Sequence, residues 1–450
     1  MTEEAVQKIA RCQTERLLRH LKDDIPFSDA KIDENIYPQL VKVSFYYTEY
    51  FEEVKKIDPN QVVKFKDLIS ENKSEYVVLT GPPGSGKTTI AKRLSCQTSA
   101  AEYFFYVSLM EVVPNGPITY KQLLLDHIFP DISEEIRKDA FRWIKENPDR
   151  CVVILDGYDQ AIWSIQDLKP QYADYETPKP VNQLVANMCC RNVFSEATLM
   201  LTSRSHALLS IPSYFRAKNT LLVHDLEEKD MKTLFFLIAR ENATEAWQRL
   251  HDKASHLLYL CYNPLLLQFV VNLLLYDSIP IQSITILFQK VIESIHRQNS
   301  SQAGSKDLMN PMSSLAFKGM EKSVFLLEVD DLQREGLTEV KVQDFVISFG
   351  KLPKSVGQRL FDGDKRFYFC HQTLQEYFAA HYIAKLMPYN KFSNLIPQIF
   401  HERRWSMVKR FLVGLLLEGA PASTHDGEKS INPASQNMKY YLHESYSVNF

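Results

Sequence analysis

The sequence has little cysteine and little net charge, and these two shortages argue against several classes of protein. Its seven cysteines among 450 residues form no C-x-x-C pair, which argues against a disulfide framework and a zinc site. The formal net charge of −3 provides no overall attraction to nucleic acid or to an anionic membrane. We therefore expect a globular protein with reduced thiols in the cytoplasm, and we read the short basic cluster HERRW (401–405) as a solvated helix face.

The sequence also lacks a signal peptide and an internal repeat. The first 24 residues, MTEEAVQKIARCQTERLLRHLKDD, carry charges throughout, and no segment of 20–50 residues recurs. One uncharged stretch, LLYLCYNPLLLQFVVNLLLY (257–276), is nearly long enough to span a bilayer. Because Asn263-Pro264, Gln268 and Asn272 interrupt it, we expect a buried helix, with a membrane span as the alternative.

The first half of the chain alternates between predicted strands and predicted helices. An amphipathic helix is expected over 3–22, a short strand or turn around Tyr37-Pro38, and a helix over 45–72. Apolar strands are then expected at 76–80, 103–109, 151–155, 198–202 and 220–223. Helices are expected from Thr88 and over 119–146 and 181–195. This alternation predicts an α/β fold with a parallel sheet and helices on both faces.

Beyond residue 225 the pattern becomes mostly helical. Asp225 and Glu228 resemble a capping box that opens a helix, and residues 227–296 read as a helical bundle. A linker is expected at 299–310, a strand at 366–370, a long helix from His371, and another helix over 400–418. The residues from 420 onward are polar.

The stretch GPPGSGKTT (81–89) matches G-x-x-x-x-G-K-[ST], the phosphate-binding loop. Its glycines let backbone N–H groups wrap a phosphate, its lysine reaches the β- and γ-oxygens, and its first threonine faces Mg²⁺. A strand is expected before it and a helix after it, which is the required context. The candidate nucleotide-binding residues here are Gly81, Pro82, Pro83, Gly84, Ser85, Gly86, Lys87, Thr88 and Thr89, with Thr88 also a metal ligand.

Two further strands end in residues that suit the same site. VVILDGYDQ (152–160) places Asp156 at the end of a buried strand, where it would hold Mg²⁺, with Asp159 close behind. The alternative for this stretch is an Asx-type turn. TLMLTSRS (198–205) places Arg204 where it could sense a γ-phosphate, because the carboxyl ends of parallel strands line the ligand crevice. The alternative is an ordinary surface arginine.

In combination, these motifs resemble the NACHT domain of the NLR-like STAND ATPases, a branch of the AAA+ kind, over roughly residues 30–418. GPPGSGKTT resembles its Walker A motif, ILDGYDQ its Walker B motif D-G-x-D-E, and LTSRS its sensor-1 segment. CYNPLLLQ resembles a G-x-P-like helical motif, and IYPQLVKVS the segment that covers the adenine base. FYFCHQTLQEYFAAHYIA resembles the winged-helix motif F-x-H-x-[ST]-x-Q-E-[FY]-x-A-A, which makes the resemblance specific.

The resemblance implies ATP or ADP with Mg²⁺ as cofactors, and it assigns further contacts. Pro264 would pack on the adenine, His371 would touch the β-phosphate of ADP, and Tyr37 and Pro38 would form part of the adenine wall. The alternatives are a helix break for Pro264 and a capping or core role for His371. The implied domains are a helical lead-in (1–70), a P-loop nucleotide-binding domain (71–225), helical domain 1 (226–300), a winged-helix domain (301–388), the start of a second helical domain (389–420) and a polar tail (421–450).

The sequence departs from the family pattern in four places. Gln160 replaces the Walker B glutamate, Ser205 stands where a proline usually follows the sensor arginine, and the loop over 165–180 is longer than usual. The sequence also shows no leucine-rich repeats and no evident death-fold or pyrin module. We therefore expect the ligand-sensing and signalling domains to be missing or supplied by another chain.

The resemblance implies a nucleotide-controlled switch in innate-immune-like signalling. ADP would hold a closed monomer through His371, and ATP would favour opening and association with further copies or with other NLR-like proteins. Hydrolysis should be slow, because Gln160 cannot accept a proton and Asp159 is the remaining candidate base. Two alternatives stay open at this point. One is a turnover ATPase or small-molecule kinase, and the other is a nucleotide-binding scaffold that does not switch.

Overall fold

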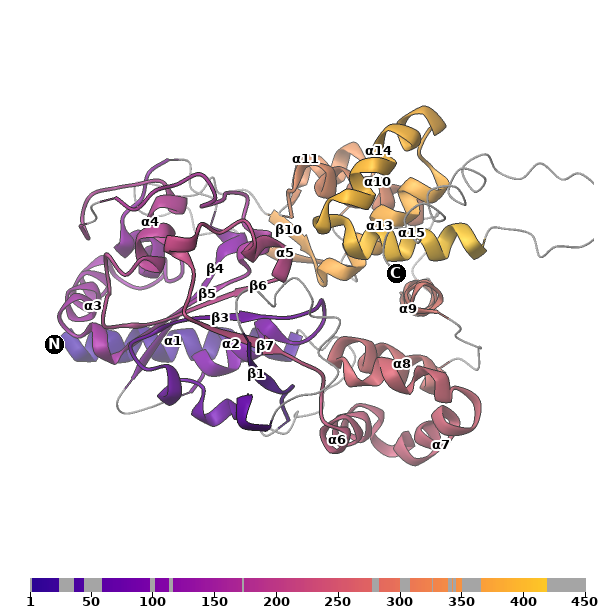
Figure 1. Ribbon diagram of the computed structural model, residues 1–450, viewed down its shortest axis with the longest axis horizontal. Coiled ribbons are helices and arrows are strands. Elements are labelled where there is room, and N and C mark those ends of the chain that lie inside the picture. The colour runs from indigo at the N-terminus through magenta and orange to yellow at the C-terminus, as the bar shows by residue number, and fades with distance from the viewer. Residues whose placement is uncertain are drawn as a thin grey trace, which may run out of the picture. The chain divides into compact units, whose positions relative to one another are not determined.

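The computed structural model describes residues 2–23, 36–43, 59–97, 102–112, 116–171, 174–276, 283–299, 308–325, 327–338, 342, 345–349 and 366–418. The chain divides into two compact units (Figure 1). The first contains residues 1–277 and 350–365, and the second contains residues 278–349 and 366–450.

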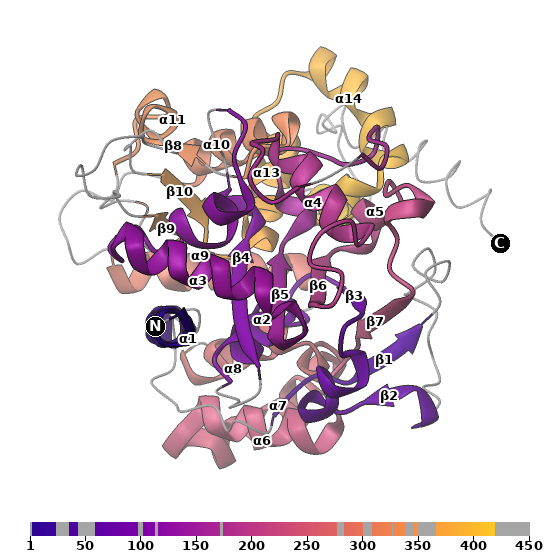
Figure 2. The same cartoon turned by 90° about the vertical axis from the view of Figure 1, so that its left-hand side faces the viewer.

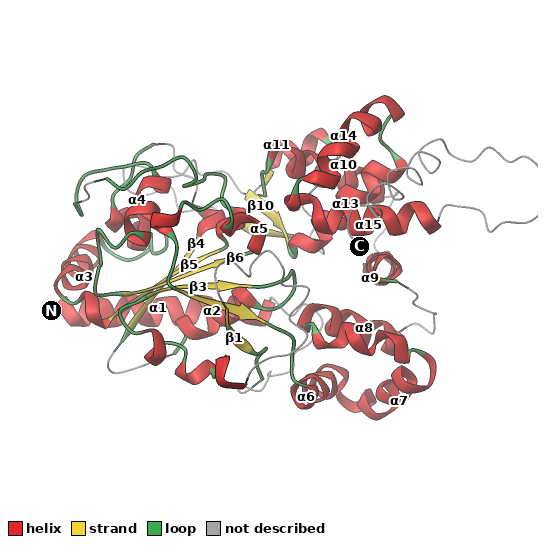
Figure 3. Ribbon diagram, in the orientation of Figure 1, coloured by secondary structure: helices red, strands yellow, loops and turns green. Residues whose placement is uncertain are grey.

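The first unit is built around a seven-stranded sheet in the order β2-β1-β7-β3-β6-β5-β4 (Figure 3). Its parallel strands are β3 (Tyr76–Thr80), β4 (Tyr103–Ser108), β5 (Cys151–Asp156), β6 (Thr198–Ser203) and β7 (Asn219–Val223). All of the strands predicted for this region are present, and the predicted parallel α/β sheet is confirmed. Both phosphate-site candidate strands, β3 and β5, pair with β6, so their carboxyl ends lie at one edge of the sheet.

Two antiparallel strands extend this sheet, and the sequence did not predict them as a pair. Strand β1 (Leu40–Val43) pairs with β2 (Val62–Val63) on one side and with β7 on the other. Leu40 lies opposite Val223, the last residue of β7. This register places the segment immediately before β1, which contains Tyr37 and Pro38, at the carboxyl edge of the parallel strands.

The predicted helix over 45–72 is wrong for its second half, and its first part lies largely outside the described residues. Residues 59–72 form three short 3₁₀ segments (Pro59–Gln61, Phe65–Asp67 and Ser70–Asn72) around strand β2. The β-branched pair Val62-Val63 lies against β1, and this sheet pairing overrides the helical spacing of the apolar residues.

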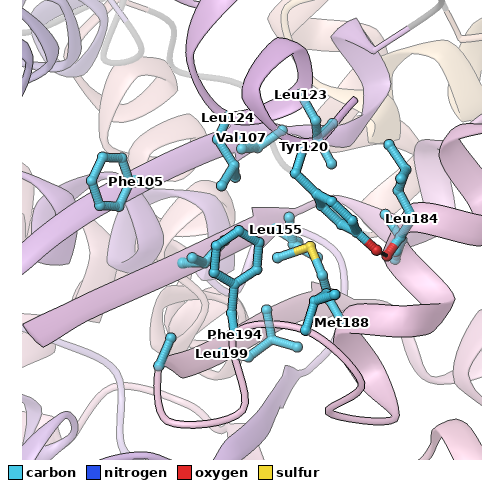
Figure 4. Packing of buried hydrophobic residues seen from close by; sticks show 14 of the residues in the cluster. Phe105, Val107, Tyr120, Leu123, Leu124, Leu155, Leu184, Met188, Phe194 and Leu199 are labelled. Carbon is cyan, nitrogen blue, oxygen red and sulfur yellow. Dashed lines mark hydrogen bonds between the residues drawn. The ribbon is translucent and has the colours of Figure 1, made fainter. Parts of the chain in front are cut away.

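Helices cover both faces of the sheet because every parallel strand alternates its buried side chains between the two faces. On one face, Phe105, Val107, Leu155 and Leu199 pack against Tyr120, Leu123, Leu124, Leu184, Met188 and Phe194 (Figure 4). The other face packs mainly against α2 (Lys87–Ser95). The helix predicted over 119–146 is interrupted: a π-helix (Gln122–Asp126) and α3 (Glu134–Glu146) flank a turn that contains Pro130. The helix predicted over 181–195 is shorter, α4 (Val181–Cys189).

The predicted N-terminal helix is confirmed as α1 (Thr2–Asp23). It packs against α2, α3 and the edge strand β4. Figure 2 shows α1 end-on, beside α3.

The rest of the first unit is helical. It contains α6 (Glu228–Ala239), α7 (Ala243–Lys253), a 3₁₀ segment (Ser255–Tyr262) and α8 (Pro264–Tyr276). The predicted capping box is wrong: Glu227, not Asp225, is the N-cap residue of α6, and it makes no side-chain capping bond. Within the described ranges, none of the helices has the length and apolar character that a membrane crossing needs.

The second unit combines helices with a small antiparallel sheet. The sheet has the order β8-β10-β9, with β8 (Leu327–Glu328), β9 (Val346–Phe349) and β10 (Arg366–Phe369), of which only β10 was predicted. Helix α13 (Gln372–Lys385) packs against α10 (Met309–Lys322) and α15 (Ser406–Glu418). The remaining helices are α9 (Ile284–Asn299), α11 (Val329–Arg334) and α14 (Tyr389–His401). The polar tail (421–450) lies outside the described residues.

Candidate functional site

The loop between β3 and α2 has the backbone shape of a phosphate cradle. Gly84 and Gly86 adopt φ angles of +74° and +93°, which residues with a side chain rarely adopt. Lys87 Nζ donates hydrogen bonds to the carbonyl oxygens of Gly81 and Pro82, at 2.8 and 2.9 Å, so the lysine arches over its own loop. Ser85 is 2% exposed, and its hydroxyl has no hydrogen-bond partner among the described residues. This loop therefore offers a buried donor, an ammonium group and a helix N-terminus to an anion.

The carboxylate of Asp156 lies at the end of β5, beside the end of this loop. Its Oδ1 accepts hydrogen bonds from Thr202 Oγ1 at 2.5 Å and from Thr88 Oγ1 at 3.4 Å, and its Oδ2 accepts one from Tyr106 at 2.9 Å. The structure thus brings together the two residues that the sequence predicts as metal ligands, Thr88 and Asp156. A hydroxyl and a carboxylate are oxygen ligands of the kind that Mg²⁺ prefers.

Asp159 and Arg204 form a buried pair next to this carboxylate. Asp159 Oδ1 accepts a hydrogen bond from the backbone N–H of Arg204 at 3.0 Å, and its Oδ2 lies 3.5 Å from Arg204 Nε. The side chains are only 5% and 11% exposed, so Arg204 is not the surface arginine of the alternative interpretation. The candidate base and the candidate γ-phosphate sensor therefore hold each other in position.

The structure adds a histidine that none of the sequence motifs indicates. His206 lies on α5 (Ser205–Leu208), two residues after Arg204. Burial lowers the pKa of His206, the Asp159 carboxylate opposes this effect, and the cations of Arg204 and Lys87 reinforce it. The electrostatic influence of these groups shows that His206 shares the surroundings of the site. The only signal in the sequence was its place two residues after the sensor arginine.

The start of α8 lies directly on the phosphate loop. Asn263 Nδ2 donates a hydrogen bond to Pro83 O at 3.1 Å, and the N–H of Leu265 points to Gly84 O at 3.4 Å. A Cβ on Gly84 would lie 2.8 Å from Leu265 Cβ, which is too close for any side chain. Pro264 is the first residue of α8 and is half-buried between these two contacts. The motif predicts a role for Pro264 but not for Asn263, the residue that makes the polar contact.

The segment before β1 reaches the same loop from the other side. Pro38 is buried, and its Cγ lies 3.8 Å from the position of a Cβ on Gly86. The Tyr37 ring stacks on Phe65, with centroids 3.7 Å apart, and the guanidinium of Arg93 lies 5.2 Å from its centroid. Pro38 therefore borders the loop directly, whereas the Tyr37 ring is engaged by Phe65 and Arg93.

His371 belongs to the second unit, where it is the residue immediately before α13. Its backbone is extended, its side chain is half-buried, and it makes no side-chain capping bond to the helix. Its contact with a nucleotide stays a prediction.

Comparison with known families agrees with this geometry. The family model "NACHT domain" matches residues 75–242, which run from β3 through the phosphate loop, Asp156 and Arg204 into α6. Over residues 75–242 this chain is therefore similar to NACHT domains. The model "NOD2 winged helix domain" matches residues 307–359, which end before β10 and His371. The family predicted from the motifs is therefore confirmed.

Individual relatives are similar over most of this chain. NACHT, LRR and PYD domains-containing protein 1a allele 1 of Rattus norvegicus is 26% identical over 340 residues, which are 72% of this chain and 26% of that protein. NACHT, LRR and PYD domains-containing protein 3 of Homo sapiens is 24% identical over 326 residues, or 68% of this chain and 30% of that protein. The chain thus spans less than a third of the length of these relatives. A solved STAND protein with a tetratricopeptide repeat sensor from Pyrococcus horikoshii aligns over 86% of this chain and 56% of its own, at 15% identity and a TM-score of 0.36.

Proposed function

We propose that this protein is a nucleotide-controlled switch of the NLR-like type, which binds ATP or ADP with Mg²⁺ and hydrolyses ATP slowly. The phosphates would lie in the loop 81–89, held by its backbone N–H groups, by Lys87 and by the buried Ser85 hydroxyl. Pro38 and Pro264 border this loop from two sides and would contact the adenine. Opening of the switch would lead to association with further copies or with other NLR-like signalling proteins.

The oxygen atoms of Thr88 and Asp156 fit a magnesium ion. Their 3.4 Å contact brings a hydroxyl and a carboxylate together at the mouth of the phosphate loop. Magnesium supplies charge neutralisation between phosphate oxygens when it is bound. Asp156 is a buried residue whose two oxygens already accept hydrogen bonds from fixed donors, so the protein orients this carboxylate in advance.

The contact between α8 and the phosphate loop is the observation that favours a switch over a simple binding scaffold. Asn263 and Leu265 contact backbone oxygens of Pro83 and Gly84, two residues of the loop itself. A loop that rearranges around phosphates would shift these two oxygens, and the N-terminus of α8 would move with them. A ligand can drive such a movement only through its difference in affinity for the two arrangements.

Slow hydrolysis follows from the groups available next to Asp156. Asp159 is the nearest candidate base, yet both of its oxygens face Arg204. Gln160, in the place of the family's glutamate, can orient water but cannot accept its proton. General-base assistance is typically worth about 10²–10⁴-fold in rate, so its weakening leaves a long-lived ATP state.

Two measurements together test this proposal: nucleotide binding, and the protection of α8 from amide hydrogen exchange. Titration calorimetry should show Mg²⁺-dependent binding of ADP and of a non-hydrolysable ATP analogue, and Lys87→Ala should abolish it. Hydrogen exchange of residues 255–276 should differ between the two nucleotide states. Equal exchange in the ADP and ATP-analogue states would favour a scaffold without switching, and steady-state turnover on the order of 1–100 s⁻¹ would favour an enzyme.

A further inference from the structure

Tyr106 connects the edge strand of the sheet to the candidate magnesium carboxylate. It lies on β4 with its side chain 7% exposed, and its hydroxyl donates a hydrogen bond of 2.9 Å to Asp156 Oδ2. In the register of the sheet, Tyr106 pairs with Ile154 and not with Asp156, so this contact runs diagonally across two strands. The other carboxylate oxygen, Oδ1, is held by Thr202 and Thr88.

We propose that Tyr106 is a positioning residue for the magnesium-binding carboxylate and that helix α1 holds Tyr106 in place through Gln13. This inference rests on the proposed nucleotide function and adds a group outside the recognised motifs. A carboxylate fixed at only one oxygen can rotate about its χ2 torsion. The Tyr106 hydroxyl fixes the second oxygen, so the carboxylate plane is set before a metal ion arrives. Hydrogen bonds of this kind typically contribute about 10–100-fold to metal affinity.

The backbone of Tyr106 is itself held by α1. Strand β4 is the outermost of the described strands of this sheet, so along one of its sides the backbone pairs with no other described strand. Gln13, which is 2% exposed, supplies that pairing: its Nε2 donates to Phe104 O and its Oε1 accepts from Tyr106 N, both at 2.9 Å. One side-chain amide thus replaces two bonds of a missing strand, and one of these bonds fixes the residue that contacts Asp156.

A neighbouring residue of α1 strengthens this attachment. Arg16 follows Gln13 by three positions and so lies on the same face of the helix. It donates to Ile128 O at 3.0 Å and to Glu111 Oε2 at 3.4 Å, and Glu111 stands just after the end of β4. Helix α1 is therefore attached along the half of β4 that leads into the site. The docking of this part of α1, through Gln13 and Arg16, should be thermodynamically linked to the magnesium affinity.

The decisive experiment compares two tyrosines of the same strand. Tyr106→Phe removes one hydroxyl and little volume, and Tyr103→Phe is the matched control because its hydroxyl contacts only Gln7 and Glu3 of α1 in the described structure. The measurement is ADP binding at a series of Mg²⁺ concentrations, with a parallel series in EDTA. The Mg²⁺ midpoint is the Mg²⁺ concentration that gives half of the maximal enhancement of ADP binding. For Tyr106→Phe we expect this midpoint to rise at least tenfold, while ADP binding in EDTA stays unchanged. Tyr103→Phe should match wild type in both measurements.

The possible results separate this inference from the function on which it rests. A wild-type protein without Mg²⁺-dependent ADP binding contradicts the proposed function. A wild type that shows this dependence, with Tyr106→Phe giving the same Mg²⁺ midpoint, contradicts the positioning role alone. If Tyr106→Phe lowers the melting temperature but not the Mg²⁺ affinity, the hydroxyl only stabilises the fold and the inference is wrong.

The role of α1 is tested with two glutamines on that helix. Gln13→Ala should shift the Mg²⁺ midpoint in the same direction as Tyr106→Phe and should make α1 more accessible to proteolysis. Gln7→Ala removes a weaker contact at Tyr103 and should leave the midpoint unchanged. If Gln13→Ala exposes α1 but leaves the midpoint at the wild-type value, α1 only covers the strand edge and does not hold Tyr106 for metal binding.

Discussion

The amide nitrogen of Asn263 donates a hydrogen bond of 3.1 Å to the carbonyl oxygen of Pro83. The two residues are 180 positions apart in the sequence, and the bond joins the start of α8 to the phosphate loop. The same side chain also caps its helix, because Asn263 Oδ1 accepts from the N–H groups of Leu265 and Leu266 at 3.2 and 3.3 Å. Asn263 therefore has two separable roles, one within the helix and one toward the loop.

Replacing Asn263 with serine separates these roles. A serine hydroxyl still caps a helix but is too short to reach Pro83, so we expect the unfolding free energy to change by less than about 1 kcal/mol. The nucleotide-dependent difference in hydrogen exchange over 255–276 should shrink or disappear. Asn263→Ala, which loses both roles, is the comparison. A serine variant that keeps the full wild-type exchange difference would show that this bond does not transmit the nucleotide state.

Alanine substitutions at Gly84 and Gly86 form a matched pair that tests how tightly α8 packs on the phosphate loop. Both have positive φ, so an alanine at either position costs roughly 1–2 kcal/mol in backbone strain. Only at Gly84 would the new Cβ also collide, at 2.8 Å from Leu265 Cβ, whereas at Gly86 the nearest atom is Pro38 Cγ at 3.8 Å. Denaturant titration without nucleotide should show Gly84→Ala to be the less stable variant, by about 1–3 kcal/mol. Equal stabilities would mean that α8 moves away freely.

The sequence was most informative where local pattern and fold agree. Each parallel strand begins or ends within a residue or two of its predicted bounds, because a buried parallel strand is a continuous apolar run. The phosphate loop, Asp156 and Arg204 follow these strands directly, and so they could be located as well. The helix expected over 45–72 failed in its second half because Val62-Val63 pairs with β1, a strand that lies outside that stretch of sequence.

The unpredicted parts of the site depend on contacts that no local pattern contains. Tyr106 lies in none of the motifs, and Asn263 occupies the variable position before Pro264 in the G-x-P-like motif. The first is recognised by its bond to Asp156 and the second by its bond to Pro83. The π-helix before α3 also escaped prediction, since the apolar spacing around Leu123–Leu125 resembles that of an α-helix. Residue type and spacing predict which loops meet, whereas the side chains that join them depend on the register of the packed elements.

Hydrolysis should respond to Gln160 in the direction of the family pattern. Gln160→Glu introduces a carboxylate that can accept a proton from water, and we expect ATP hydrolysis to rise about tenfold or more. Asp159→Asn should reduce hydrolysis and also stability, by roughly 3 kcal/mol, because it removes the negative charge that lies 3.5 Å from the buried Arg204 guanidinium. Phosphate release measures the first effect and denaturant titration the second. A Gln160→Glu variant with wild-type turnover, beside an inactive but folded Asp159→Asn variant, would identify Asp159 as the base.

His127 should make the protein less stable in mild acid. Burial lowers its pKa from an ordinary 6.5 to about 4, and its Nδ1 lies 3.2 Å from Gln122 O. The unfolded chain therefore binds a proton at His127 as pH falls below 6.5, while the folded chain does not until near pH 4. The loss between pH 7 and 4.5 is about 2.5 kcal/mol for this group. His127→Asn keeps a donor without titrating, so its unfolding free energy should fall less over this range. If the unfolding free energy of His127→Asn fell with pH as steeply as that of wild type, His127 would not be the group responsible.

His371 can be tested against a second histidine of the same helix segment. If His371 contacts the β-phosphate of ADP, His371→Ala should weaken ADP binding about tenfold, the usual worth of a hydrogen bond to a charged group, and change ATP-analogue binding less. His381 is the control because its Nδ1 contacts Ser313 Oγ at 3.0 Å, within the second unit, and His381→Ala should lower stability without changing the ratio of the two affinities. In the presence of ADP, the His371→Ala protein should also associate into larger species at a lower protein concentration than wild type does. Sedimentation would measure this difference. A His371→Ala protein that stays monomeric with wild-type ADP affinity would mean that this histidine serves the packing of α13, and that the switch holds its closed state by another contact.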